Sequence, residues 1–237
     1  MANDYFKFKQ FKVLQRKSAM RVGTDSVLLG AWANVANVIN AIDVGTGTGV
    51  IALMLAQRNP LMKIDAVELD SDSAAEATDN VTRSPWASSI NVVNMAFQDF
   101  ANQSGKAYEL IVSNPPYFNN SLKSPLAKRT LTRHTESLPY HDLLLGVQHL
   151  LAHNGRFCGI FPYSEGNVFI AQASTFGLYC THKVSIVTKP GKPTLRILVQ
   201  LEKERQPVTE TELTIHNPDG TYTKEYKQLT SEFYLAF

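Results

Sequence analysis

The sequence contains little cysteine: Cys158 and Cys180 are the only two among 237 residues. Each lies in a strand-like stretch, where a small buried thiol is far commoner than a disulfide or a metal ligand. We therefore assign neither cysteine a role, and we expect no metal site.

Long apolar runs are also missing. No stretch approaches the length needed to cross a bilayer, and Lys and Arg interrupt the apolar stretches of the first thirty residues, unlike in a signal peptide. We expect a cytoplasmic protein with no membrane partner. No repeat or linker divides the chain, and 44% hydrophobic composition is enough for one core. The expected organisation is one structural domain, in which a basic and aromatic extension, residues 1–40, packs on a core, residues 41–237.

Acidic residues are scarce at the start of the chain. Over the first 21 positions six lysines and arginines stand against Asp4 alone, and phenylalanines alternate with the lysines. Aromatic side chains among cations suit a nucleic acid, so Lys7 and Lys9 are candidate RNA contacts. An amphipathic strand or hairpin, with phenylalanines in the core and lysines in water, explains the same alternation. Both interpretations can hold together, and the net charge of +2 is too small to decide between them.

A strand, a glycine turn and a helix follow one another between residues 41 and 56. The turn contains Gly45, Gly47 and Gly49. Glycines at alternate positions let the backbone turn sharply and approach a ligand at the start of the helix. The G-x-G-x-G spacing departs from the dinucleotide pattern, and the Lys-Ser/Thr of a P-loop is missing. Phosphate binding is therefore not the expected use of this loop.

Acidic residues follow the next two predicted strands. Glu68 ends the strand at residues 63–67, roughly twenty residues beyond the glycines, where an acidic side chain reaches ribose hydroxyls. Asp99 comes after the strand at residues 90–93. It can accept a hydrogen bond from the amino group of a bound adenine, or it can be an ordinary loop carboxylate.

Two predicted helices begin at polar residues. Thr24 or Asp25 is expected to cap a short apolar helix, and we interpret Asp70 and Asp72 as caps of a later one. Capping explains Thr24 without any function. A helix start this close to the glycine turn could also form one wall of a cofactor pocket, so Thr24 is a candidate cofactor contact as well.

The fourth strand, residues 108–112, runs into the corner Ser113-Asn114-Pro115-Pro116-Tyr117. Prolines donate no backbone hydrogen bond and keep the preceding residue extended, so carbonyls and the Asn114 amide are left to face outward. A planar NH2 group suits this corner: Asn114 and the Pro115 carbonyl can each accept one N–H, and Tyr117 offers a flat face for stacking. Such a grip would aim the nitrogen lone pair at an electrophile. The alternative is a simple proline-rich turn.

All four strands end in polar residues at what would be one carboxyl edge of a parallel sheet. At this point the chain resembles the S-adenosylmethionine-dependent methyltransferases of the Rossmann-like class. Residues 43–49 look like their first motif, Glu68 like their ribose-binding acid, and Asn114-Pro115-Pro116-Tyr117 like their amino-methylating motif. The resemblance implies S-adenosylmethionine as cofactor, with Asp43 in its site. It also implies an α/β fold with a mostly parallel seven-stranded sheet, helices on both faces, and an antiparallel last strand.

The segments before and after these motifs give a closer resemblance. Residues 20–32, the step Arg133-His134, residues 189–196 and the tail at residues 233–235 resemble the bacterial tRNA1(Val) adenine-37 N6-methyltransferases. This resemblance covers nearly the whole chain. It implies a tRNA partner and methylation of the adenine 3′ to the anticodon.

Two further basic clusters are candidate RNA contacts. Residues 119–133 contain no acid, and the second cluster lies between two strands predicted near the end of the chain. The candidates are Lys128, Arg129, Arg133, Lys192 and Arg196. Solvated loops explain these cations equally well, and His134 is more often structural than catalytic. No base is needed, because the methylated nitrogen is cationic and loses its proton to water.

Three other functions stay open. A protein glutamine methyltransferase uses the same corner, but usually has a helical substrate domain before it. A ribosomal RNA guanine-N2 methyltransferase more often has Phe at the fourth position of the corner. A non-catalytic RNA-binding module would explain the basic clusters but not the complete cofactor edge. The polar stretch after Arg205, with a turn at residues 217–220, predicts a peripheral hairpin or a mobile tail.

Overall fold

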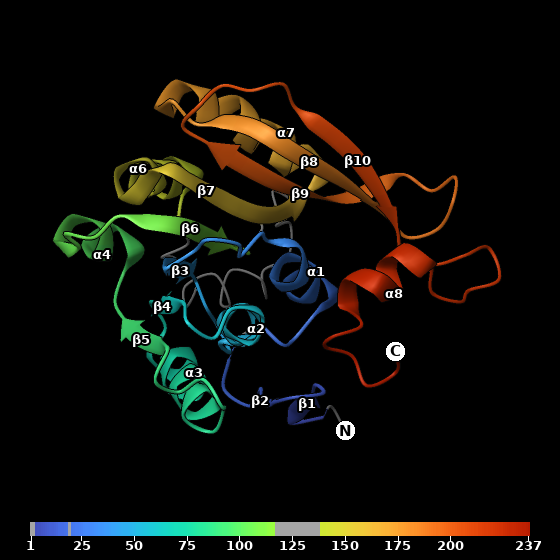
Figure 1. Ribbon diagram of the computed structural model, residues 1–237, viewed down its shortest axis with the longest axis horizontal. Coiled ribbons are helices and arrows are strands. Elements are labelled where there is room, and N and C mark those ends of the chain that lie inside the picture. Colours follow the sequence, from blue (N-terminus) through green and yellow to red (C-terminus); the bar gives the residue numbers. More distant parts are fainter. Residues whose placement is uncertain (1–2, 19, 117–137) are drawn as a thin grey trace, which may run out of the picture.

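The computed structural model describes residues 3–18, 20–116 and 138–237 (Figure 1). In chain order the elements are β1 (Tyr5–Lys7), β2 (Lys12–Leu14), α1 (Thr24–Trp32), β3 (Asn40–Val44), α2 (Val50–Arg58), β4 (Lys63–Glu68), α3 (Ser71–Thr82), β5 (Ile90–Asn94), α4 (Phe97–Gln103), β6 (Tyr108–Ser113), α6 (Tyr140–Leu150), β7 (Leu151–Pro162), α7 (Tyr163–Ala173), η1 (Ser174–Phe176), β8 (Tyr179–Val187), β9 (Thr194–Glu202), β10 (Thr209–Thr214) and α8 (Lys224–Thr230). Within these ranges no helix is both long and apolar enough to span a membrane.

The central sheet has eight strands within the described residues, in the order β10-β8-β9-β7-β6-β3-β4-β5. Within this sheet only β9 is reversed: it runs antiparallel to both β7 and β8, whereas the other described pairs of the sheet are parallel. The predicted mostly parallel sheet is therefore confirmed, and so is the antiparallel strand that was expected seventh and last. An eighth strand, β10, extends the sheet beside β8, and Figure 1 shows it at the opposite end from β5.

Strand β10 corrects the expectation of a peripheral hairpin or tail after Arg205. Its sequence, Thr-Glu-Thr-Glu-Leu-Thr, is polar because an edge strand buries little, and Leu213 is its one buried residue. The predicted turn is present, since the Gly220 N–H donates to the Asn217 carbonyl at 3.0 Å. An isolated antiparallel bridge between His216 and Tyr222 brackets this turn, and helix α8 follows.

The two faces of the sheet carry separate clusters of buried residues, as the alternation of side chains along a strand requires. Ala41 and Leu110 face the cluster that contains α1 and α2. Ile42 and Ile111 face the cluster that contains α4, α6 and α7. Helices therefore cover both faces, as predicted.

The hairpin β1–β2 packs against the end of the chain, and Figure 1 shows both termini on the same side of the molecule. Phe8 is buried, stacks on Phe11 with 4.6 Å between ring centroids, and meets Phe233 edge to face. The Lys9 N–H donates to the Phe233 carbonyl at 2.9 Å. The interpretation of this segment as a hairpin with buried phenylalanines and exposed lysines is confirmed.

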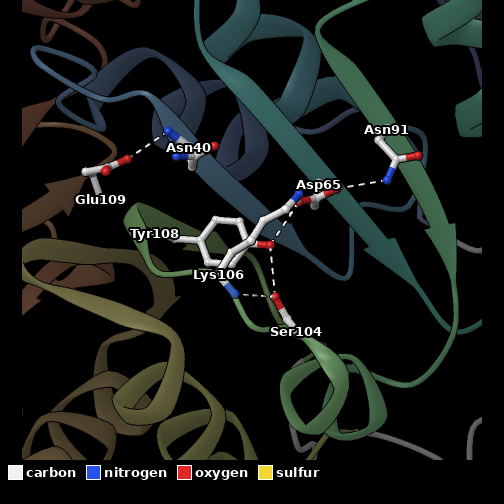
Figure 2. Close-up of polar contacts among 7 residues, drawn as sticks. All are labelled: Asn40, Asp65, Asn91, Ser104, Lys106, Tyr108 and Glu109. Carbon is white, nitrogen blue, oxygen red and sulfur yellow. Dashed lines mark hydrogen bonds and ion pairs between the residues drawn. The ribbon is translucent and has the colours of Figure 1, made fainter.

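A carboxylate near the amino edge of the sheet joins three strands (Figure 2). Asp65 on β4 accepts hydrogen bonds from the Tyr108 hydroxyl on β6, at 2.9 Å, and from the Asn91 amide on β5, at 2.9 Å. Lys106 lies 3.5 Å from the same carboxylate. Burial raises the pKa of Tyr108 to about 12, so the phenol keeps the proton that it donates. Because β3 lies between β4 and β6, the Tyr108–Asp65 bond crosses over strand β3.

We expect Tyr108→Phe to destabilise the protein by about 1–3 kcal/mol, because Asp65 then loses a donor in a partly buried position. The measurement is the free energy of unfolding from urea denaturation. Tyr163→Phe is the matched control, since the Tyr163 side chain is 46% exposed. Equal stability of Tyr108→Phe and the control would contradict a supporting role for this bond.

Candidate active site

Four strand ends lie level with one another at the carboxyl edge of the sheet. Val44 pairs with both Val67 and Ser113, and Glu68 pairs with Asn94. The chain leaves β3, β4, β5 and β6 immediately after these pairs. The structure thus brings the glycine turn, Glu68 and the Asn114 corner to one edge.

The glycine turn needs glycine at each of its three alternate positions. Gly45, Gly47 and Gly49 have φ of 69°, 55° and 80°, in the left-handed region that other residues rarely adopt. The N–H groups of Gly45 and Thr46 both donate to the Val67 carbonyl, at 2.9 and 3.1 Å, which ties the turn to β4. A side chain at Gly45 would enter open space within the described structure. The turn therefore presents bare backbone at the strand ends, as a cofactor cradle requires.

Asp43 is buried directly beneath the turn. Its Oδ2 accepts hydrogen bonds from the Thr46 hydroxyl at 2.6 Å and from the Ala52 N–H at 3.1 Å, joining the turn to the first turn of α2. Its Oδ1 is buried with no hydrogen-bond partner in the described part of the chain. Burial raises the pKa of Asp43 to about 7 in spite of the two hydrogen bonds. The contacts show that Asp43 fixes the shape of the turn, and its direct contact with a cofactor stays a prediction.

Glu68 holds the other side of the turn. Its Oε2 accepts the Gly47 N–H at 2.8 Å and its Oε1 accepts the Asp70 N–H at 2.9 Å. Each carboxylate oxygen has a second lone pair, so the half-buried side chain can still accept one ribose hydroxyl on each oxygen. The residues present therefore fit the ribose of a nucleoside cofactor.

The alternative that Asp99 is a loop carboxylate is wrong. Asp99 belongs to the first turn of α4 and is exposed, because the chain re-enters a helix at Phe97, three residues after β5 ends. A carboxylate there is favourable to the helix dipole, which gives Asp99 a structural role of its own. Its contact with an adenine stays a prediction.

The predicted cap of α1 at Thr24 or Asp25 is wrong. The N-cap is Gly23, whose N–H donates to the Ser26 hydroxyl at 3.3 Å and whose carbonyl accepts from that hydroxyl at 3.0 Å. Thr24 is the exposed first residue of the helix. The cap at Asp70 is confirmed, since its carboxylate accepts the Ser73 N–H at 2.8 Å.

The corner follows directly on the end of β6. The Ser113 hydroxyl donates to the Val44 carbonyl at 3.0 Å, fixing the end of β6 to the end of β3. Asn114 is half-buried, Pro115 is buried and Pro116 is exposed. The predictions for Tyr117, Lys128, Arg129, Arg133 and His134 fall on residues 117–137, outside the described residues.

The remaining RNA candidates lie in two places. Lys192 is exposed in the turn between β8 and β9. This turn is at the carboxyl edge, because β8 and β7 are both antiparallel to β9 and β7 is parallel to β6. Arg196, at the start of β9, forms an ion pair with Asp25 at 2.9 Å. Lys7 and Lys9 lie on the terminal hairpin, where Lys9 Nζ donates to the Ser231 carbonyl at 2.6 Å and to the carbonyl of Phe237. The structure thus brings Lys192 and Arg196 to the site edge, and binds Lys9 into the fold.

Sequence reasoning missed two buried polar residues on α3, Glu76 and Asn80. The available signal was their spacing of one helical turn on the same face as small apolar residues, an arrangement that leaves polar groups buried. No three His, Cys, Asp or Glu side chains come together as a metal site in the described ranges.

Comparison with known proteins gives concordant matches. The profile of the methyltransferase small domain matches residues 18–144. A tRNA1(Val) (adenine(37)-N6)-methyltransferase of Trichodesmium erythraeum is 43% identical over 239 residues, covering 100% of both chains. One of Bacteroides fragilis is 44% identical over 236 residues, covering 99% of both. A solved structure titled as a predicted O-methyltransferase, from Agrobacterium tumefaciens, matches with a TM-score of 0.67 at 17% identity over 88% of this chain and 96% of its own, a likeness of fold alone.

The pKa of Asp43 predicts a pH dependence of stability. The native carboxyl holds its proton up to about pH 7, whereas the unfolded one releases it near its ordinary value of 3.8. The native state therefore binds more protons in this window, so rising pH lowers the free energy of unfolding, by up to about 1.4 kcal/mol per pH unit.

Asp43→Asn should remove this slope, because the amide does not titrate and its oxygen can still accept from Thr46. Urea denaturation between pH 4.5 and 7.5 measures the difference between wild type and variant. Asp79→Asn, at an exposed position on α3, is the control and should follow the wild type. A difference between Asp43→Asn and wild type that does not vary with pH would disprove the raised pKa.

Proposed function

This chain belongs to the family of tRNA1(Val) (adenine(37)-N6)-methyltransferases, and we propose on this premise that it methylates the N6 amine of adenine 37 in tRNA1(Val). The cofactor is S-adenosylmethionine. The observation that carries the proposal is the alignment of the strand ends, which sets the glycine turn, Glu68 and Asn114 on one edge. In that arrangement Glu68 on β4 would hold a nucleoside, and Asn114 on β6, on the other side of β3, would hold an amine.

The chain supplies the binding groups on the β3 and β4 side. The carboxylate of Glu68 would accept the ribose hydroxyls, and the bare backbone at Gly45 would lie against the rest of the cofactor. When bound, S-adenosylmethionine supplies a methyl group on a positively charged sulfur, which is the electrophile of the reaction. Asp43 acts by keeping the turn in its shape.

The corner supplies the grip on the substrate amine. The Asn114 side-chain oxygen and the Pro115 carbonyl would each accept one N–H, which orients the nitrogen lone pair. Tyr117 would stack on the base. Once the nitrogen carries the methyl group it is cationic, and it returns to neutrality by releasing a proton to water. No side chain is required as a base.

Substrate choice would come from the surroundings of the corner, because an amide also presents two N–H groups. Lys192 and Arg196 lie at the same edge, and Lys128, Arg129 and Arg133 follow the corner in the chain. A base extruded from an RNA loop can be stacked and read on its edge. We therefore propose tRNA as the partner, Lys7 as an outlying contact, and the cytoplasm as the location.

Asn114→Ala should separate binding from chemistry. We expect the affinity for S-adenosylmethionine to stay close to that of wild type, while turnover falls by roughly a hundredfold or more, as when a positioned acceptor is lost. Calorimetric titration and single-turnover methylation measure the two effects. Wild-type turnover in this variant would show that the corner is a proline-rich turn without a role in catalysis.

The substrate is tested by incubating the protein with unmodified tRNA1(Val) transcript and S-adenosylmethionine labelled in the methyl group. We expect label in N6-methyladenosine after nuclease digestion, and none in purified protein fractions. A transcript with guanine in place of adenine 37 is the matched control and should take up no label. Label in a glutamine side chain or in N2-methylguanosine would overturn the proposal in favour of the corresponding alternative.

A further inference from the structure

The carboxylate of Glu76 is buried in α3 and receives three backbone N–H groups from consecutive residues. Its Oε1 accepts from Arg16 at 2.6 Å and from Lys17 at 3.0 Å, and its Oε2 accepts from Ser18 at 2.9 Å. The residue is 4% exposed. A buried carboxylate is stable only when hydrogen bonds replace its water, and the chain segment at residues 16–18 provides them.

Asn80, one turn further along α3, extends the same contact to the glycine turn. Its side-chain oxygen accepts the Leu14 N–H at 2.7 Å. Its amide donates to the Leu14 carbonyl and to the Thr48 carbonyl, both at 2.9 Å. Asn80 is 1% exposed and uses both donors and its oxygen. Glu76 and Asn80 thus form a bracket that holds residues 14–18 against the glycine turn.

The held segment lies beside Gly47. A β-carbon at Gly47 would be 3.6 Å from the Ser18 hydroxyl, and the Gly47 N–H is already bound to Glu68. The side-chain oxygen of Gln15 accepts the Val22 N–H at 3.0 Å, which ties this segment to the residue before the N-cap of α1. The bracket therefore holds Ser18 next to the glycine turn at Gly47.

The order of the strands indicates which part of the cofactor would lie next to this segment. On the proposed function, Glu68 on β4 would hold the ribose and Asn114 on β6 would hold the amine. Strand β3 lies between them, so the glycine turn at its end would lie against the sulfur and the amino-acid chain of the cofactor. Ser18 flanks that turn at Gly47.

We infer that Glu76 is a positioning residue for S-adenosylmethionine, which acts through the backbone of residues 16–18 on the amino-acid end of the cofactor. This inference rests on the proposed function. The alternative is that the bracket only attaches the N-terminal segment to α3, in which case its loss would affect every ligand of the site to the same degree. A ligand that lacks the amino-acid end separates the two.

The test compares S-adenosylhomocysteine with 5′-methylthioadenosine, which has no amino-acid end, by calorimetric titration of the full chain. In Glu76→Gln an NH2 group replaces one acceptor and faces a backbone N–H. We expect the Kd for S-adenosylhomocysteine to rise about tenfold or more, since hydrogen bonds to a charged group are lost. The Kd for 5′-methylthioadenosine should change by less than about twofold. Asp79→Asn, an exposed acid on the same helix, is the control for the change of charge.

Two further measurements keep the test decisive. Glu76→Asp keeps the buried charge but withdraws it by one methylene, so its effect should have the same direction if Glu76→Gln unfolds. Hydrogen exchange at the amides of residues 16–18 should accelerate in both variants. Wild-type affinity for S-adenosylhomocysteine in both variants, or an equal loss for the two ligands, would overturn the inference and leave the proposed function intact. A wild-type protein that binds neither ligand would overturn both.

Discussion

The hydrogen bonds of the buried Asp43 side chain are the contacts on which the rest of the site depends. They join the glycine turn to the start of α2 through Thr46 and Ala52, so three residues with positive φ keep one conformation. The turn then carries the other contacts: Gly47 orients Glu68, and Thr48 receives Asn80. One oxygen of Asp43 is buried without a hydrogen-bond partner among the described residues, and burial raises the pKa of Asp43 to about 7. Carboxyl groups with such raised pKa values cluster where a fold serves a ligand.

The central strands could be predicted because they are buried on both faces and appear in the sequence as short, mainly apolar stretches. The run at 108–112 and the short strand before the glycines are examples, and each ends within a residue of its predicted boundary. Strand β10 escaped prediction for the opposite reason, since an edge strand needs only Leu213 in the core and otherwise resembles a polar tail. Burial, which makes a strand visible in the sequence, decreases towards the edge of the sheet.

The residues of the site likewise fall into those that could be predicted from the sequence and those that could not. The glycine turn, Glu68 and Asn114 follow from local rules, because each residue directly ends a strand or turns the chain. The Glu76 contact with the N-terminal segment does not, since 58–60 residues separate the partners. The Arg196–Asp25 pair spans 171 positions. Only the assembled fold defines such partners, so an interior polar residue on a helix indicates that a partner exists without identifying it.

The same limit applies to positive charge as a sign of RNA binding. Lys9 and Arg196 counted equally with Lys7 and Lys192 in the sequence, yet the first two hold the chain together. Lys9 fixes the C-terminal segment to the hairpin, and Arg196 fixes β9 to α1 beside the site. Of these four cations, Lys7 and Lys192 are exposed and are not engaged in the fold in the same way, so they stay candidates for RNA contacts. Because counterion release requires cations that can reach phosphates, a count of lysines and arginines in a sequence overstates the number of cations available to a nucleic acid.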